Sequence, residues 1–123
     1  MILAALGPVA LAGQALASTE KQKIEMLIKL IGDLQDANFV RNGSSYSASN
    51  AATFLRRKWQ ANNSKVKTAR DFIERVASFS GTSGKPYLIR FKNGKETKSR
   101  EFLITALREI EQTPGERQPG SEG

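Results

Sequence analysis

The sequence contains no histidine and no cysteine among its 123 residues. The lack of histidine removes the most common general base, the usual zinc ligand and every Ser-His or Cys-His nucleophile pair. The lack of cysteine removes disulfides, thiolate metal sites and a lipoprotein anchor. We therefore expect no catalytic residue, no metal site and no cofactor.

Other routes to catalysis find little support in the residues that are present. Most carboxylates fall on exposed positions of predicted helices, and no two of them pair in an apolar setting that would raise a pKa. The segment Gly81-Thr82-Ser83-Gly84-Lys85 lacks the glycine spacing of a phosphate-binding loop and runs from a helix into a strand, the reverse order. A hydrolase based on Ser83 and Lys85 would require a desolvated lysine, and nothing nearby provides one. We expect a protein that is not an enzyme.

Charged side chains are absent from residues 1–17, MILAALGPVALAGQALA. This apolar run ends in Ala15-Leu16-Ala17, which fits the small-x-small cleavage site of a secretory signal peptide. No basic residue precedes the run, which leaves open whether the natural start lies upstream of Met1. The alternative is a buried N-terminal helix, which two glycines and a proline disfavour. We expect cleavage after Ala17, export to the periplasm, and no stable membrane insertion of the mature chain.

The net charge of +7 lies entirely after this segment. Residues 112–123 hold one arginine and two glutamates, so the part expected to fold carries +8. A positive balance of this size favours polyanionic partners such as nucleic acid, lipid head groups or acidic envelope polymers. Export would separate the protein from nucleic acid and therefore counts against nucleic acid as the partner. A polyanion or nucleic-acid binder is accordingly the alternative function and not the first.

Four helices are predicted, each from an N-terminal cap followed by an apolar stripe at three- and four-residue spacing. The caps are Thr19 with Gln22, Ser47 or Ser49, Thr68 with Asp71, and Ser99. The stripes are Ile24, Leu27, Ile28, Ile31 and Leu34; Ala51, Ala52, Phe54, Leu55 and Trp59; Phe72, Ile73, Val76 and Ala77; and Phe102, Leu103, Ala106, Leu107 and Ile110.

A β-hairpin is predicted over residues 83–98, where Tyr87, Ile89 and Phe91 alternate with Leu88, Arg90 and Lys92 and Asn93-Gly94 suits a two-residue type I′ turn. This register places Lys92 opposite Lys95 and Arg90 opposite Thr97. It also puts Arg90, Lys92 and Lys95 on one basic face, although a lysine-rich edge that discourages strand association is the competing interpretation.

The chain as a whole is predicted to form a single α+β domain over residues 18–111, mostly helical, with about four helices and a short antiparallel β-hairpin. Asn42-Gly43 predicts a second brief hairpin or a tight loop ahead of the second helix. Residues 112–123, rich in proline and glycine, predict a disordered tail.

Several short motifs, taken in order, resemble the YfeK-like family of small exported bacterial proteins. They are Phe39-Val40-Arg41-Asn42-Gly43 with Tyr46, Phe54-Leu55 with Lys58-Trp59, Val66-Lys67-Thr68-Ala69 with Phe72-Ile73, and Ser83-Gly84-Lys85-Pro86-Tyr87. The resemblance runs from about Glu20 to Glu111. It implies an envelope location and a helical domain with a small hairpin, and it implies no activity.

The polar residues within these motifs indicate where to look for a site: Arg41, Asn42, Tyr46, Lys58, Lys85 and Tyr87. Such residue types recognise carboxylates, phosphates or sugars. The competing interpretation is that Arg41 and Lys85 bond carbonyls of neighbouring turns while both tyrosines are half-buried. We expect a binding module for an envelope protein or an anionic ligand, with the oligomeric state left open.

Overall fold

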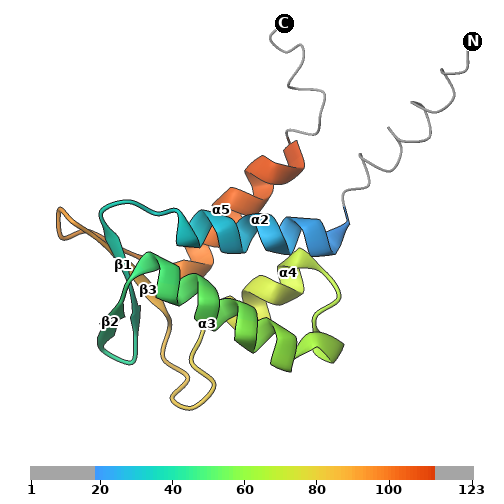
Figure 1. Cartoon of the computed structure of the whole chain (residues 1–123), viewed down its shortest axis with the longest axis horizontal. Helices are drawn as coiled ribbons and strands as arrows, with labels where there is room; N and C mark the ends of the chain where they lie inside the picture. Colours follow the sequence, from blue (N-terminus) through green and yellow to red (C-terminus); the bar gives the residue numbers. More distant parts are fainter. Residues whose placement is uncertain (1–18, 113–123) are drawn as a thin grey trace, which may run out of the picture.

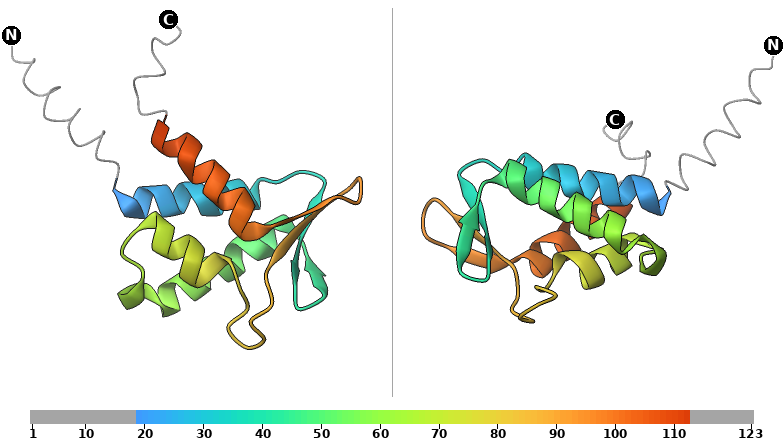
Figure 2. Two further views of the ribbon diagram at one scale, coloured as in Figure 1. Left: turned by 180° about the vertical axis from the view of Figure 1, so that it is seen from behind. Right: turned by 60° about the horizontal axis from the view of Figure 1, so that its bottom comes forward.

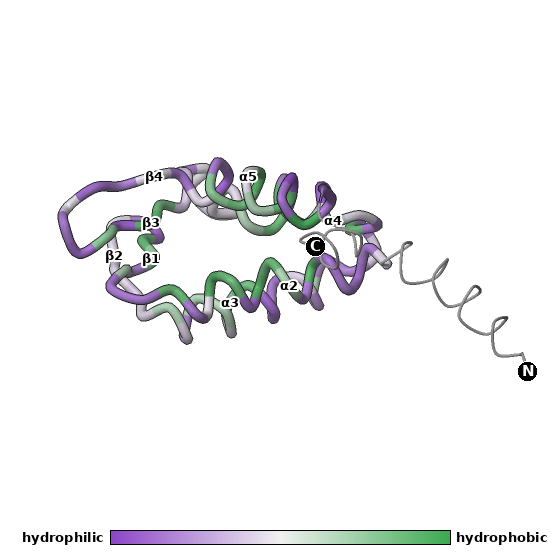
Figure 3. The backbone as a smooth tube through the Cα atoms, turned by 90° about the horizontal axis from the view of Figure 1, so that it is seen from above, coloured by the Kyte–Doolittle hydropathy of each residue, from purple (hydrophilic) through white to green (hydrophobic). Residues whose placement is uncertain are grey.

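Two layers of helices enclose the core, and a small sheet closes one end of it (Figure 1; Figure 3). Helices α2 (Glu20–Gly32) and α3 (Ala48–Ala61) form one layer; α4 (Ala69–Phe72), its π-helical continuation η3 (Ile73–Ala77) and α5 (Ser99–Gln112) form the other. The structure is a computed structural model that describes residues 19–112. The predicted export segment 1–17 and residues 113–123 of the predicted tail lie outside the described residues. The expected mostly helical α+β class is confirmed.

Side-chain caps fix where three of the helices begin. Thr19 forms the predicted capping box with Gln22; Thr68 caps α4 as predicted, and Asp71 completes a capping box there that the sequence did not predict. Ser47, one of the two predicted candidates, caps α3 by accepting a hydrogen bond from the Asn50 amide at 3.1 Å. A short 3₁₀ turn, η2 (Asn63–Lys65), then leads from α3 toward α4.

The core forms where the apolar stripes of the two layers meet. Leu27, Leu55 and Phe72 are completely shielded from solvent, as expected for stripe residues. The Trp59 ring packs edge-to-face on Phe72 with centroids 6.2 Å apart, so Trp59 is a core residue as predicted. The first turn of α2 and the last turn of α5 meet at the end away from the sheet (Figure 2), where Lys23 and Glu111 form an ion pair of 3.1 Å.

The sheet consists of two hairpins joined side by side in the order β2-β1-β3-β4, all antiparallel. The first hairpin comprises β1 (Ala37–Arg41) and β2 (Ser44–Tyr46); the second comprises β3 (Leu88–Phe91) and β4 (Glu96–Lys98). Pairing of Phe39 with Ile89 across β1 and β3 places both of these buried residues on the core face. The sequence predicted the hairpins separately and did not predict that they share one sheet.

The first Asn-Gly turn forms the brief hairpin that its sequence predicts. Arg41 pairs with Ser44, so Asn42 and Gly43 are the two loop residues. Both have positive φ, 51° and 83°, as a type I′ turn requires. Arg41 therefore stands at the last paired position of β1, on the same face as Phe39 two residues earlier.

The predicted register of the second hairpin is wrong by one residue. Arg90 pairs with Glu96 rather than Thr97, and Phe91 faces Lys95, donating its amide to the Lys95 carbonyl at 2.8 Å. The turn contains three residues, with Gly94 alone at positive φ (91°), the three-residue alternative to a type I′ turn. The Lys92 amide is held by the Asp36 carbonyl at 2.7 Å, which prolongs the contact between β1 and β3 past Phe91.

The expectation that Ser99 caps the last helix through its side chain is also wrong. Ser99 is the first residue of α5 and is fully buried, and its hydroxyl has no hydrogen-bond partner among residues 19–112. Its backbone amide instead donates to the Tyr87 carbonyl at 2.9 Å. The start of α5 is thus fastened to the residue before β3 by the backbone.

Candidate anion-binding site

Arg41 reaches from the end of β1 onto two aromatic rings. Its guanidinium carbon lies 4.6 Å from the centroid of the Phe54 ring on α3 and 5.9 Å from that of Tyr46 on β2. Its Nη1 atom donates to the Tyr46 hydroxyl at 3.3 Å. Cation–π contact and this hydrogen bond hold the guanidinium in one place while leaving most of its N–H groups unused.

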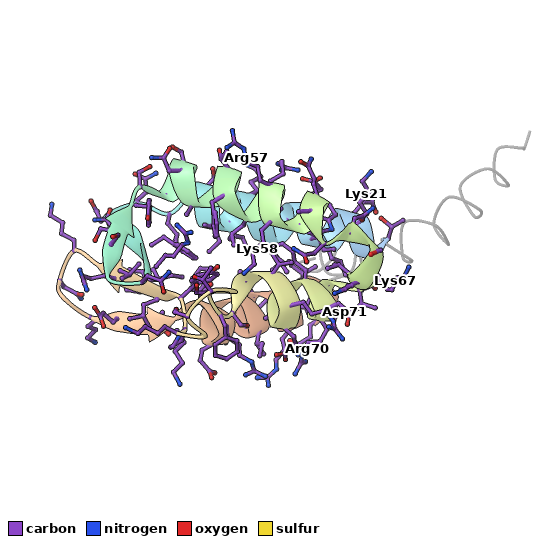
Figure 4. The ribbon with its side chains drawn as sticks, turned by 90° about the horizontal axis from the view of Figure 1, so that it is seen from below. Lys21, Arg57, Lys58, Lys67, Arg70 and Asp71 are labelled. Atoms are coloured by element: carbon purple, nitrogen blue, oxygen red, sulfur yellow. The ribbon has the colours of Figure 1, made fainter. Side chains whose placement is uncertain are left out.

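Lys58 approaches the same region from α3. It lies four residues after Phe54, so the two side chains share one face of the helix. Figure 4 shows Lys58 reaching toward the other helical layer, whereas Arg57 points outward. The Lys58 ammonium donates to the Tyr87 hydroxyl and to the Phe79 carbonyl, both at 2.9 Å.

Tyr87 fixes the position of the hydroxyl that receives Lys58. The residue is only 1% exposed, and its ring packs against Phe39 and Phe54 with centroids 5.2 and 5.9 Å away. Burial raises the pKa of the Tyr87 hydroxyl, and the positive charge of Arg41 together with its side-chain hydrogen bond to this hydroxyl partly offsets the effect. The hydroxyl therefore stays protonated at neutral pH and can donate a hydrogen bond of its own.

Arg41 and Lys58 form a cationic pair to which the described residues contribute no carboxylate. Burial, and after it the charge of Arg41, lowers the pKa of Lys58 from its ordinary value. Neither cation forms an ion pair within residues 19–112. Other cations of the protein do, with partners on a neighbouring element: Arg56 with Glu25 at 2.7 Å, Arg90 with Glu96 at 2.7 Å and Arg100 with Glu74 at 2.8 Å. An anion from outside would neutralise the pair.

The loop between η3 and β3 borders the site and is held to the first hairpin. Ser80, only 4% exposed, accepts from the Asn42 side-chain amide at 3.2 Å. The Ser83 hydroxyl donates to the side-chain oxygen Oδ1 of Asn42. Asn42 thus positions the loop instead of facing a ligand, which is a structural role that the sequence did not distinguish from binding.

Lys85 and the predicted basic face are not part of this cluster. The Lys85 side chain is exposed, and the described part of the chain shows no hydrogen bond or ion pair for its ammonium group. Arg90 is paired with Glu96, Lys92 belongs to the turn, and the register puts Lys95 opposite Phe91. The predicted face of Arg90, Lys92 and Lys95 therefore does not form as a single surface.

Phe54 is the member of the site that the sequence analysis missed. The apolar stripe of α3 predicts Phe54 as a core residue, but it is only partly buried and its ring contacts the guanidinium of Arg41. Its spacing of four residues from Lys58 is the signal that could have marked it. Of the six predicted site residues, the structure brings together Arg41, Tyr46, Lys58 and Tyr87 around this phenylalanine.

The site is a cluster of hydrogen-bond donors and positive charge on an aromatic surface. Between residues 19 and 112, no three acidic side chains gather as a metal site would require. No helix in that range is both long and apolar enough to cross a membrane. The chemistry available from Arg41, Lys58 and the two tyrosines is the binding of an anionic or strongly accepting group.

These features define a small α+β domain with a cationic, aromatic-lined cluster beside its sheet. Residues 18–111 match the family of unknown function DUF5329, and the chain belongs to that family. It is also similar to the uncharacterized protein YfeK of Salmonella typhimurium, with 35% identity over 68 residues that cover 55% of this chain and 57% of the relative. No solved structure matches the chain.

Proposed function

We propose that this protein is an exported, non-enzymatic binding module that holds an anionic group of an envelope partner or ligand on the Arg41–Lys58 pair. One observation carries the proposal: two partly buried cations lie close enough to affect each other electrostatically, and no carboxylate within residues 19–112 forms an ion pair with either of them. Like charges in a partly desolvated place are unfavourable on their own. A bound anion would relieve this repulsion.

The surroundings of the pair support a binding role over a purely structural one. A lysine that only fastened the loop could do so fully exposed, but Lys58 is held between the Tyr87 hydroxyl and the Phe79 carbonyl beside a second cation. Arg41 is oriented by Tyr46 and Phe54 before any ligand arrives. Orientation in advance lowers the entropic cost of binding.

Export is proposed from residues 1–17, which have the apolar composition and the Ala15-Leu16-Ala17 ending of a signal peptide. The test is cell fractionation followed by N-terminal sequencing of the purified protein. A periplasmic protein that begins at Ser18 would support the proposal. Recovery from the cytosol with Met1 retained would overturn it.

Anion binding is tested by NMR titration of the ¹⁵N-labelled protein with sulfate, phosphate and acetate at constant ionic strength. We expect saturable shifts centred on the Arg41 side chain and the amides of Tyr46 and Phe79. Arg41→Gln should abolish them. Arg90→Gln is the matched control because it removes the same charge from the opposite face of the sheet and should leave them unchanged.

The alternative function is general polyanion binding, which the exposed cations Lys21, Arg57 and Lys67 would favour. For a polyanion binder, the logarithm of the binding constant falls linearly and steeply with the logarithm of the salt concentration. NMR chemical-shift changes that spread over the whole basic surface would support this alternative. If these changes were equal in Arg41→Gln and wild type, they would reject the specific site.

A further inference from the structure

We propose that the group held by the Arg41–Lys58 pair is a carboxylate attached to an apolar group, and not a phosphate. This inference depends on the proposed function, because it specifies the ligand of the same site. It follows from the number and arrangement of hydrogen-bond donors that the structure leaves available, and from the apolar surface beside them.

Arg41 offers a planar fork to the ligand. A guanidinium has five N–H donors; one donates to the Tyr46 hydroxyl and another interacts with the Tyr87 hydroxyl, which leaves three for a ligand. Because Phe54 occupies one face of the guanidinium, a ligand is bound best at its edge, in the plane of the N–H groups. Two parallel N–H groups at such an edge match the two oxygens of a carboxylate.

Lys58 adds few donors to this fork. Its ammonium has three N–H groups, and the Tyr87 hydroxyl and the Phe79 carbonyl already accept two of them. One N–H remains for a ligand. The available donors therefore suit a group with two oxygens and a single negative charge, and they leave the additional oxygens of a phosphate unsupported.

Backbone amides, which usually complete a phosphate site, are already engaged in the adjoining glycine-containing loop. The Thr82 and Ser83 amides both donate to the Ser80 hydroxyl at 3.3 Å. The Gly84 amide donates to the Ser80 carbonyl at 2.9 Å, and the Lys85 amide donates to the Ser83 hydroxyl at 3.1 Å. The loop that resembles a phosphate loop in sequence thus turns its donors inward.

Apolar surface lies next to the cations. Phe79, whose carbonyl receives Lys58, leaves 46% of its own surface exposed, one of the few large hydrophobic residues of the described chain to do so. Tyr46 and Phe54 are partly exposed at the other side of Arg41. An inorganic anion would gain nothing from these rings, whereas a carboxylate carried by an apolar group could cover them.

Such a carboxylate could come from a peptide C-terminus or from an acyl chain, and the test separates the two. The mature chain is titrated with N-acetylphenylalanine, its amide, octanoate and phenyl phosphate, following the Arg41 side-chain signal by NMR. We expect the carboxylates to bind roughly tenfold or more tightly than phenyl phosphate, the change that one charge-assisted hydrogen bond supplies. The amide should not bind. The tighter of N-acetylphenylalanine and octanoate identifies the source.

Arg41→Lys provides the decisive variant because it keeps the charge and removes the fork. It should lose the preference for carboxylate over phosphate, whereas Arg90→Lys should retain it. If phenyl phosphate binds as tightly as the carboxylates, the inference is wrong while the proposed function survives. If none of the probes perturbs Arg41, the inference is wrong, and absence of sulfate, phosphate and acetate binding as well would reject the proposed function.

Discussion

The Lys58 ammonium donates a hydrogen bond of 2.9 Å to the hydroxyl of Tyr87, 29 positions later in the chain. This contact links α3 to the residue before β3, so it belongs to the fold and to the site at once. We expect Tyr87→Phe to lower the free energy of unfolding by about 1 kcal/mol, the net value of one hydrogen bond, because the ring contacts persist. Urea unfolding at neutral pH measures this.

Tyr46→Phe is the matched control for that change. Its hydroxyl accepts only a longer bond, 3.3 Å from Arg41, and the residue is more exposed than Tyr87. Tyr46→Phe should therefore lower the free energy of unfolding by less than Tyr87→Phe does. Equal losses in the two variants would show that burial of the Tyr87–Lys58 contact contributes nothing.

The stability of the protein should rise with pH in a way that depends on Lys58. Because burial and Arg41 lower its pKa in the folded state, the unfolded chain holds the proton more tightly. Stability then increases as pH rises from the folded-state pKa toward the ordinary lysine value of 10.5. Measurements kept below pH 10.0 avoid the titration of Tyr87, whose raised pKa acts in the opposite direction only above that value.

Lys58→Met should remove this rise, whereas Lys85→Met, which deletes an exposed lysine, should keep the wild-type slope. The measurement is the free energy of unfolding in urea at each pH. A rise of the same size in Lys58→Met would assign the pH dependence to other groups and would contradict the desolvation of Lys58.

Asn42 combines a backbone role with a side-chain role, and two substitutions separate them. Asn42→Gly keeps the positive φ of 51° accessible and removes the bonds to Ser80 and Ser83. Asn42→Ala removes the same bonds and also strains the turn, so we expect it to be less stable than Asn42→Gly by about 1 kcal/mol. Thermal or urea unfolding compares the two. Equal stability would show that the turn relaxes.

In both variants the loop after η3 should exchange its amide hydrogens faster, with Gly84 the clearest reporter, since its bond to the Ser80 carbonyl lies within the released loop. Protection unchanged from wild type would mean that Asn42 does not hold the loop in place.

The helices were predictable because their signals are local. Thr19, Ser47 and Thr68 each precede an apolar stripe, and the chemistry of a cap depends on only three or four neighbouring residues. The register of the second hairpin was not predictable from the same kind of signal. Asn93-Gly94 permits more than one turn, and the choice involves the contact of the Lys92 amide with Asp36, a residue of another segment.

The site was predictable in its residue types and less so in its geometry. Arg41, Tyr46, Lys58 and Tyr87 meet because β1 pairs with β3 beside α3, an arrangement that no local pattern specifies. Lys85 shares a motif with Tyr87, but it lies in the loop before β3 and its side chain is exposed, so closeness in sequence does not bring it into the cluster.

Glu20 joins α2 to α4 and should make the protein sensitive to acid. Its Oε1 atom accepts from the Ala69 amide at 2.8 Å, and this bond is the main reason that the pKa of Glu20 lies below its ordinary value of 4.5. A carboxyl with a lowered folded-state pKa contributes stability above its unfolded pKa and loses it as pH falls through the folded value. We expect Glu20→Gln to reduce stability at pH 7 by about 1 kcal/mol, because a neutral amide is the weaker acceptor.

The difference between Glu20→Gln and wild type should narrow as the pH falls below 4.5, since the protonated glutamate then resembles glutamine. Glu101→Gln is the control: its side chain is 63% exposed and its contact with Arg100 is long, at 3.9 Å, so it should leave stability unchanged at every pH. A stability difference between Glu20→Gln and wild type that stays constant from pH 7 to the acid transition would show that the carboxylate charge does not strengthen the bond to Ala69.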